Sequence, residues 1–288
     1  MSNDNKVKKK PGKRLTNKQL SIQKLLPNIL TTIGMCAGLT AIRFALEGDW
    51  EKAVFAILVA AAFDTIDGLS ARLFGASSRF GAELDSLADV ISFGVAPAVV
   101  IYAWIGQDII DPAATADDKY LLKWYWIPIL AYTTCNALRL ARFNVMHGAI
   151  SPEAKQERDN NYLVGVPAPA AAGLVSMPLA VEFILHRFEV PIRLSEYPYP
   201  LLILGWTMVV SVLMISRLPT FSFKNVRFRV PQHQAIIVLL LTSLSVAVFL
   251  HEPWIFLFSL GLIYLGSIPF SVWAYGIDKN KDKVKKNA

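Results

Sequence analysis

The sequence predicts an all-α protein, a polytopic membrane bundle of about eight transmembrane helices. Three observations lead to this fold class. Hydrophobic residues make up 54% of the 288 residues, only 18% are charged, and the mean hydropathy is +0.41. A soluble domain of this length carries more charge and shorter apolar runs. Apolar stretches long enough to cross a hydrocarbon core of about 30 Å as helix recur along this chain.

Eight segments have the length and apolar character of a membrane span. In chain order they are residues 29–46, 52–74, 86–106, 124–143, 166–186, 199–216, 234–250 and 254–274. The first follows a long basic leader, and carboxylates interrupt the second at its end and the third at its start. The fifth begins beside Pro167 and Pro169, which favour a break at a helix start. The last two carry no motif that points to a function.

The spans define three parts of the chain. Residues 1–26 form a basic tail, in which Leu15, Ile22 and Leu26 share one face of a short amphipathic segment that would lie on anionic headgroups. The alternative for this tail is an orientation signal alone. Residues 27–275 form the transmembrane domain, and residues 276–288 form a second basic tail.

The basic residues predict the orientation. The net charge is +7, and most Lys and Arg lie in the two tails and in alternate loops. The opposite loops hold only Lys52, Lys119, Lys123, Arg187 and Arg193. The positive-inside rule therefore predicts that both termini are cytoplasmic, which requires an even number of spans. This placement of charge indicates an integral protein of the cytoplasmic membrane, with membrane lipids rather than nucleic acid as its partners.

Four aspartates are the candidate metal ligands. Asp64 and Asp67 are three residues apart, and Asp85 and Asp89 are four apart, so each pair lies on one helix face. Because two helix ends joined by a short loop can bring all four together, their mutual repulsion would require cations. Oxygen ligands select Mg²⁺ or Mn²⁺, and four carboxylates suit two ions of the kind that assist phosphoryl transfer.

The residues around these aspartates predict a phosphate-binding surface. Gly68 and Gly81 leave room for a phosphorylated substrate, and Arg72 offers a planar donor to a phosphate oxygen. The alternative is structural: the aspartates would reach toward water at the membrane surface, or would pair with Arg72 and Arg79.

The stretch "DTIDGLSARLFGASSRFGAELDSLAD" (64–89) resembles the CDP-alcohol phosphotransferase signature, D-x2-D-G-x2-A-R-x8-G-x3-D-x3-D. All eight fixed positions match. The resemblance implies a helical membrane enzyme, commonly a homodimer, that moves a phosphatidyl group from CDP-diacylglycerol to an alcohol and releases CMP. It implies that Asp64, Asp67 and Asp85 hold the metals and that Asp89 is the general base, which would also contact a metal.

The same resemblance implies the residues of the nucleotide site. By position, the CDP-lipid site would be lined by Gly68, Ala71, Arg72 and Gly81. Upstream, "PNILTTIG" (27–34) resembles the family's P-N-x-x-T element, so that Asn28 and Thr31 would face the nucleotide and the metals. The alternative for Asn28 is a helix cap.

Three further segments resemble the family members that use serine as the acceptor. They are "LRLARFN" (138–144), "GVPAPAAAG" (165–173) and "SRLPTFSFK" (216–224). L-Serine needs donors for its carboxylate, which Arg139, Arg142 and Asn144 would supply. The alternative is that these arginines contact lipid phosphates. The same ambiguity, a phosphate of the CDP-lipid or a lipid headgroup, applies to the basic residues Arg79, Arg217 and Lys224.

Two other functions remain open on the sequence alone. The first is an enzyme of the same family with another acceptor: glycerol 3-phosphate, inositol phosphate or choline. A phosphorylated acceptor would need a dense basic cluster and choline an aromatic cage, and the motif region shows neither clearly. The second alternative is a divalent-cation transporter. Transporter sites tend to lie near the bilayer midplane in paired repeats. These aspartates lie at one side of the membrane, and no second set follows, so the sequence favours the enzyme.

Overall fold

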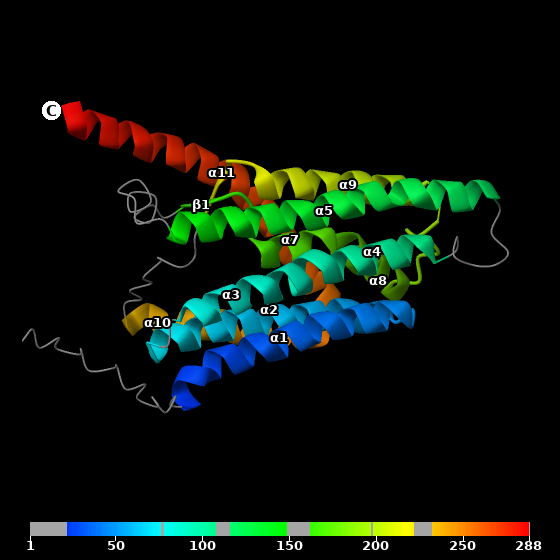
Figure 1. The fold of residues 1–288 in the computed structure, drawn as a ribbon, viewed down its shortest axis with the longest axis horizontal. Helices are drawn as coiled ribbons and strands as arrows, with labels where there is room; N and C mark the ends of the chain where they lie inside the picture. The colour runs from blue at the N-terminus through cyan, green and yellow to red at the C-terminus, as the bar shows by residue number, and fades with distance from the viewer. Residues whose placement is uncertain are drawn as a thin grey trace, which may run out of the picture.

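The protein is a bundle of long helices that run roughly along one axis (Figure 1). The computed structural model describes residues 22–75, 78–107, 116–148, 162–196, 198–221 and 232–287. The helices are α1 (Ile22–Leu46), α2 (Trp50–Leu73), α3 (Arg79–Asp89), η1 (Val90–Val95), α4 (Ala96–Gly106), α5 (Ala116–Gly148), α7 (Ala168–Val175), α8 (Met177–Arg187), α9 (Tyr199–Ile215), α10 (Gln232–His251) and α11 (Pro253–Asn287). Two short strands, β1 (Tyr162–Val164) and β2 (Pro219–Phe221), pair antiparallel.

Each of the eight predicted segments is helical, but eight spanning helices are not confirmed. By length and composition, four helices of the described chain can cross a membrane: Leu25–Leu46, Trp50–Leu73, Arg79–Gly106 and Pro253–Tyr275. The pair α7 and α8, bent by 40°, makes a fifth if it counts as one span. Helix α9 and residues Ile236–His251 are apolar but shorter. The prediction of an all-α membrane protein is therefore confirmed in its coarser form.

Local sequence signals explain several helix boundaries. Asp49 caps α2 by accepting a hydrogen bond from the Lys52 backbone N–H (3.2 Å), and Ser78 caps α3 by accepting one from Gly81 N–H (2.9 Å). Pro167 directly precedes α7, as the sequence predicts. Asn28 is not a helix cap, because α1 begins at Ile22 and Asn28 lies inside it. Of the predicted amphipathic segment, Leu15 lies outside the described residues, and Ile22 and Leu26 belong to the start of α1.

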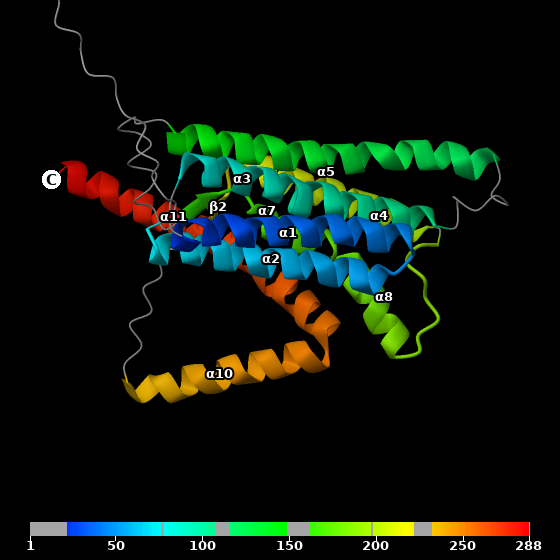
Figure 2. The same ribbon diagram turned by 60° about the horizontal axis from the view of Figure 1, so that its bottom comes forward.

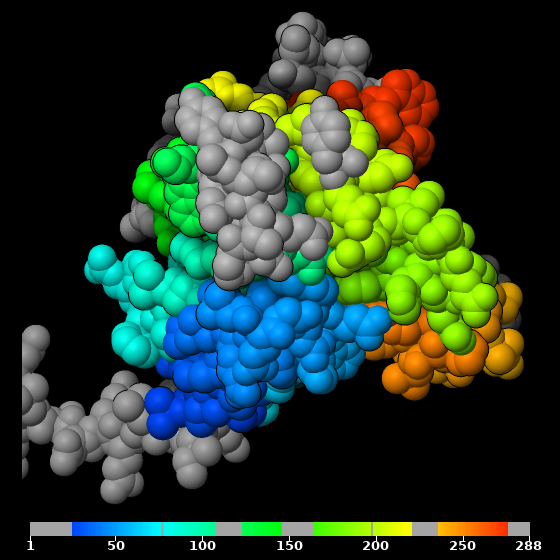
Figure 3. Space-filling model, turned by 90° about the vertical axis from the view of Figure 1, so that its right-hand side faces the viewer, coloured from blue at the N-terminus to red at the C-terminus, as the bar shows by residue number. Residues whose placement is uncertain are grey.

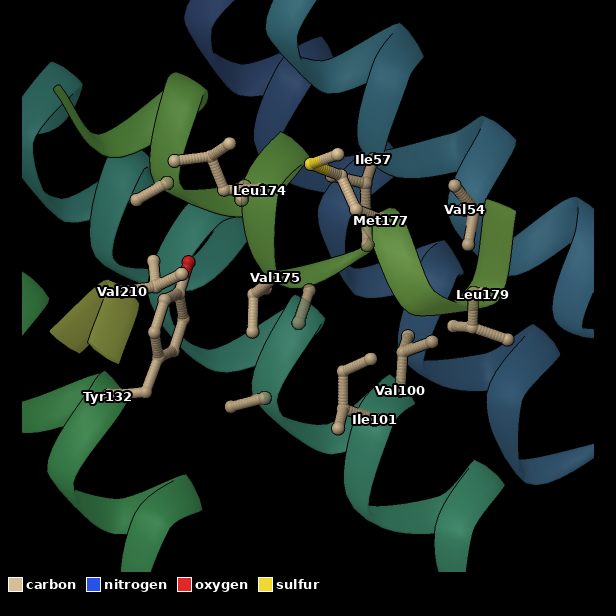
Figure 4. Close-up of a cluster of buried hydrophobic side chains, with 14 of the residues drawn as sticks. Val54, Ile57, Val100, Ile101, Tyr132, Leu174, Val175, Met177, Leu179 and Val210 are labelled. Atoms are coloured by element: carbon tan, nitrogen blue, oxygen red, sulfur yellow. The ribbon is translucent and has the colours of Figure 1, made fainter. Parts of the chain in front are cut away.

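The hydrophobic core lies where α2, α4, α5, α7, α8 and α9 meet (Figure 4). Its largest fully buried side chains include Trp104, Ile101, Tyr132, Leu174 and Leu179. By contrast, α10 diverges from the bundle and packs chiefly on α11 (Figure 2), and most of its apolar side chains are exposed. Such a surface would be costly in water and is expected where lipid surrounds a helix.

Several chain segments converge at one end of the bundle. The start of α1, the end of α2, the start of α3 and the C-terminal part of α11 lie at that end in both ribbon views (Figures 1 and 2). The opposite end is built from the start of α2, the end of α8 and the junction of α10 with α11 (Figure 3). The four signature aspartates belong to the α2 and α3 segments that lead to the first of these ends.

Candidate active site

Three of the predicted metal ligands meet in space. Asp64 and Asp67 lie on α2, and Asp85 lies on α3. One carboxylate oxygen from each can be chosen so that all three lie within 4.8 Å of one another. Both helices pack against α1, which brings their acidic faces together. Asp67 is only 5% exposed, so burial alone would make an uncompensated charge here costly.

The aspartates line a narrow cleft between four helices. Its cavity volume is about 10 Å³. The cleft is lined from α1 by Thr31, Gly34 and Met35, from α2 by Ala60, Asp64 and Asp67, from α3 by Asp85, Ala88 and Asp89, and from η1 by Ser92 and Phe93. Small side chains on α1 and α2 allow these helices to approach closely. All four signature aspartates therefore share one cleft, as the spacing predicts.

Asp89 occupies a different place in the cleft from the other three aspartates. Asp89 does not belong to the three aspartates whose carboxylate oxygens lie within 4.8 Å of one another. Its carboxyl group is nevertheless within hydrogen-bonding reach of Asp64. It also interacts electrostatically with Asp85 and with Arg139 of α5. Asp89 is thus the member of the set that faces both the acidic cluster and a cation.

A turn of π-helix sets the position of Asp89. Asp89 ends α3, and the next six residues form η1. A π-helix bonds residue i to i+5, leaving backbone groups out of the usual α pattern, and is frequent at functional sites. The Tyr132 hydroxyl donates to Phe93 O (2.7 Å) and the Thr133 hydroxyl to Gly94 O (3.3 Å). A methyl group at Gly94 would overlap the amide of Asn136. Glycine therefore lets α5 approach η1 closely.

Thr31 and Asn28 lie at the acidic cleft, as the resemblance implies. The Thr31 hydroxyl donates to Asp67 Oδ2 (2.6 Å) and lies 3.0 Å from Pro27 O. Thr31 therefore fixes one carboxylate oxygen of Asp67 and leaves the other available to an ion. The Asn28 Oδ1 atom packs on Gly81, where an added Cβ would lie 2.8 Å away. A side chain at position 81 would thus displace Asn28.

The other residues assigned to the nucleotide lie at the open side of the cluster. Gly68 is exposed with open space around its Cα, and Ala71 is half-buried one turn later. Arg72 and Arg79 are exposed, and neither forms an ion pair with a described residue. The structural alternative, in which these arginines neutralise the aspartates, is therefore not supported in the described chain.

The residues predicted for the acceptor separate into distinct environments. Arg139 is half-buried and lies near Asp89, whereas Arg142 is exposed. The Asn144 amide donates to the Ser86 hydroxyl (2.9 Å) and thereby ties α5 to α3 next to Asp85. Arg217 is exposed in the loop before β2, and Lys224 lies outside the described residues.

Sequence reasoning missed several polar residues around the cleft. No motif marks these residues, because each has the sequence context of an ordinary helix residue. They are Ser86, Tyr132, Asn136 and Tyr264. For Asn136, the available signals were an amide inside an apolar span and a glycine, Gly94, in the middle of another. Without the fold, neither signal shows that Asn136 packs against Gly94.

The donor set fits a divalent cation. The cluster offers carboxylate oxygens alone, from three aspartates close enough to share an ion. Oxygen-only sites favour hard cations such as Mg²⁺, Mn²⁺ or Ca²⁺ over softer metals. A helical membrane protein with such an acidic cleft at one end belongs to the class of proteins that handle divalent cations or phosphorylated substrates at the membrane surface.

Comparison with known proteins narrows this class. The family model for CDP-alcohol phosphatidyltransferases matches residues 24–215, and the chain belongs to this family of integral membrane proteins. The chain is 36% identical to a CDP-diacylglycerol–serine O-phosphatidyltransferase of Mycobacterium leprae, over 86% of this chain and 74% of that protein. It is 31% identical to the Helicobacter pylori protein of the same name, over 76% and 81%. It is also 31% identical to an archaetidylserine synthase of Methanothermobacter thermautotrophicus, over 65% and 74%.

Proposed function

We propose that this protein is a phosphatidylserine synthase, which transfers the phosphatidyl group of CDP-diacylglycerol to the hydroxyl group of L-serine and releases CMP. The observation that carries the proposal is the convergence of Asp64, Asp67 and Asp85 in one cleft with Asp89 beside them. The relatives supply the acceptor, because bacterial proteins that align over most of this chain are named for serine. The archaeal relative is named for a serine lipid as well.

Asp64, Asp67 and Asp85 would hold the metal, and two Mg²⁺ or Mn²⁺ ions fit the full set with Asp89. Bound there, the ions would neutralise the diphosphate of the CDP-lipid and the negative charge of the departing CMP. Thr31 orients Asp67 through its 2.6 Å hydrogen bond, so one oxygen of this carboxylate keeps a fixed direction.

The open side of the cluster would bind the CDP moiety. The exposed, uncrowded face at Gly68 and Ala71 lets a nucleotide lie close to the α2 backbone. Arg72 would donate to a phosphate oxygen as charge develops on it. Asn28 and Gly81 are in contact at the start of α1 and α3 and would form the neighbouring wall. Arg79, Arg217 and Lys224 would serve as further phosphate or headgroup contacts.

Asp89 would act as the general base. The serine hydroxyl oxygen attacks the phosphorus next to the diacylglycerol, and the bond from this phosphorus to the oxygen of CMP breaks. The hydroxyl proton passes to the Asp89 carboxylate, and CMP leaves with the electron pair. The acceptor would be bound by residues of α5, for which Arg139, Arg142 and Asn144 are the candidates from the sequence.

We further propose that the acidic end of the bundle faces the cytoplasm. The first described helix starts at that end and the last one ends there (Figure 1), which supports an even number of spans, for which the sequence suggests eight. The three-part organisation, with basic tails at 1–26 and 276–288 around a domain at 27–275, belongs to the same proposal. So does the homodimer that the family resemblance implies.

The test is a reconstituted transfer assay with labelled CDP-diacylglycerol. We expect release of CMP and formation of phosphatidylserine only when L-serine and Mg²⁺ or Mn²⁺ are both present. Glycerol 3-phosphate, inositol phosphate and choline would be offered in parallel. Product with one of these and none with serine would refute the acceptor. Release of CMP that persists in excess chelator would refute the metal-dependent mechanism.

A further inference from the structure

Three side chains near the proposed base carry buried polar atoms that have no hydrogen-bond partner among the described residues. Asn136 is fully buried, and neither its Oδ1 nor its Nδ2 bonds to a described residue. The Nε of Arg139 is buried and likewise unbonded within the described chain. The hydroxyl of Tyr264, also buried, faces Thr220 and Arg139 without forming a well-aligned hydrogen bond among the described residues.

These three residues belong to one location. Asn136 and Arg139 are one helical turn apart on α5 and share a face. Arg139 interacts electrostatically with Asp89 on one side and with Tyr264 of α11 on the other. Asn136 packs on Gly94, which lies one π-helical turn beyond Asp89. Arg139 therefore links Asp89 to Tyr264, and Asn136 lies one turn away on the same face of α5, against η1.

Packing alone does not account for this group. A buried polar atom without a partner costs about 1–3 kcal/mol, so buried polar groups in proteins are almost always bonded. Elsewhere in the described chain, many polar side chains of the bundle find partners: the Tyr132 hydroxyl donates to Phe93 O, and the Thr207 hydroxyl to Ile203 O. The other buried side-chain atoms without a partner among the described residues are two serine hydroxyls, those of Ser176 and Ser195. Unbonded donors that converge beside a catalytic carboxylate are instead expected where a polar ligand binds.

We propose that Asn136, Arg139 and Tyr264 form the subsite that binds the carboxylate of the acceptor amino acid. This inference rests on the proposed function and deepens it by assigning the recognition of serine to named side chains, two of which, Asn136 and Tyr264, carry no motif. All three can donate hydrogen bonds, which suits an anion, and Arg139 adds a charge.

The position next to Asp89 fits the size of the acceptor. In serine, the hydroxyl-bearing carbon is bonded directly to the carbon that carries the amino and carboxyl groups. A carboxylate held by Arg139 thus places the hydroxyl within reach of Asp89, and Asn136 Oδ1 is available to the ammonium group. An acceptor without a carboxylate would leave these donors unbonded, which penalises its binding strongly.

The test uses the full-length enzyme in lipid nanodiscs and measures KM for L-serine and for CDP-diacylglycerol separately. Tyr264→Phe removes one hydroxyl and keeps the ring, and Arg139→Lys keeps the charge but loses the planar donors. For each we expect the KM for serine to rise about tenfold or more, because a hydrogen bond to a charged group is lost. The KM for CDP-diacylglycerol should stay within about twofold.

A substrate analogue separates recognition of the carboxylate from a general defect. L-Serine amide keeps the hydroxyl and the amine but lacks the anionic group. We expect kcat/KM for the amide to fall far less than that for serine in both variants. Tyr102→Phe, which removes the hydroxyl from a ring that packs on Trp126, is the matched control and should leave the KM for both substrates unchanged.

Two results would overturn the inference. One is an unchanged KM for serine in both variants; the other is an equal loss for serine, the amide and CDP-diacylglycerol together with a lower Tm. Either result leaves the proposed function standing if the wild-type enzyme still makes phosphatidylserine. The proposed function itself fails only if the wild-type enzyme makes none.

Discussion

The two ends of helix α2 carry the same kind of side chain in opposite settings. At its start, Asp49 accepts hydrogen bonds from Lys52 Nζ (2.6 Å) and from the Lys52 backbone N–H. In its second half, Asp64 and Asp67 face another acid, Asp85. The opposite end of the bundle also contains the ion pairs Arg43–Glu47, Arg193–Glu196 and Arg187–Glu252. Acids there pair with bases, whereas three of the four acids at the cleft lie close to one another.

This difference separates a structural acid from a functional one. A carboxylate at a helix start is stabilised by the free N–H groups and by a nearby lysine, so it needs no ligand. Carboxylates that gather in a partly buried cleft repel one another, and a bound divalent cation would offset their charge. The comparison predicts that substitutions at the two ends of α2 affect different properties: activity at one end and helix stability at the other.

The largest effect is expected for Asp67→Asn, which removes the most buried carboxylate of the three-aspartate cluster. Transfer should fall to background at every Mg²⁺ concentration, since the neutral amide no longer attracts the ion. Without metal, the variant should be at least as thermally stable as the wild type, because a repulsive charge is gone. CMP release and Tm in chelator measure the two expectations. Near-normal turnover would show that Asp67 is not a ligand.

Asp89→Asn should come next and should show a different pattern. Loss of a general base lowers kcat by about 10²–10⁴-fold. The three remaining aspartates would still hold the proposed metal, so the Kd for the CDP-lipid should change little. Rapid-quench turnover and equilibrium binding of the CDP-lipid separate these quantities. If binding is lost along with turnover, Asp89 is a metal ligand first and the proton acceptor must be sought elsewhere.

Much of this site could be predicted from the sequence. The spacing of Asp64, Asp67, Asp85 and Asp89 already predicts one shared face on each of two helices, and the structure places all four in one cleft. The "PNILTTIG" element also predicts that Thr31 lies near the aspartates, and the Thr31 hydroxyl donates to Asp67. Periodicity within a helix and a motif with fixed spacing are local signals, so they survive without knowledge of the fold.

The contacts between distant helices could not be predicted in this way. Asn136 and Tyr264 reach the region of Asp89 only because η1 changes the register of its helix and α11 returns along the bundle. The sequence likewise assigned Asn144 to the acceptor, whereas its amide bonds to Ser86 of α3. The number of spans could not be predicted from apolar character for a related reason: α9 and the apolar part of α10, Ile236–His251, are apolar but shorter than the helices that meet the length of a membrane span.

Thr31→Val should have an intermediate effect. The change keeps the shape of the side chain but removes the donor that orients Asp67 Oδ2. Partners that orient metal ligands typically contribute about 10–100-fold to metal affinity or activity. We therefore expect a higher Mg²⁺ concentration for half-maximal activity. Thr32→Val is the matched control, because among the described residues its hydroxyl donates to the backbone carbonyl of Asn28 (2.8 Å) and to no carboxylate. Equal metal requirements in the two variants would contradict the role of Thr31.

The smallest effect on activity is expected for Asp49→Ala. The hydrogen bonds from Lys52 lower the pKa of Asp49, so its ionised form is the one that stabilises the folded protein. That stabilisation is complete above the ordinary aspartate pKa of about 4 and is lost as the pH falls through the lowered value. At neutral pH the variant should therefore show a slightly lower Tm with unchanged kcat and metal requirement. A loss of transfer activity comparable to that of Asp67→Asn would mean that the two ends of α2 do not divide structure from function.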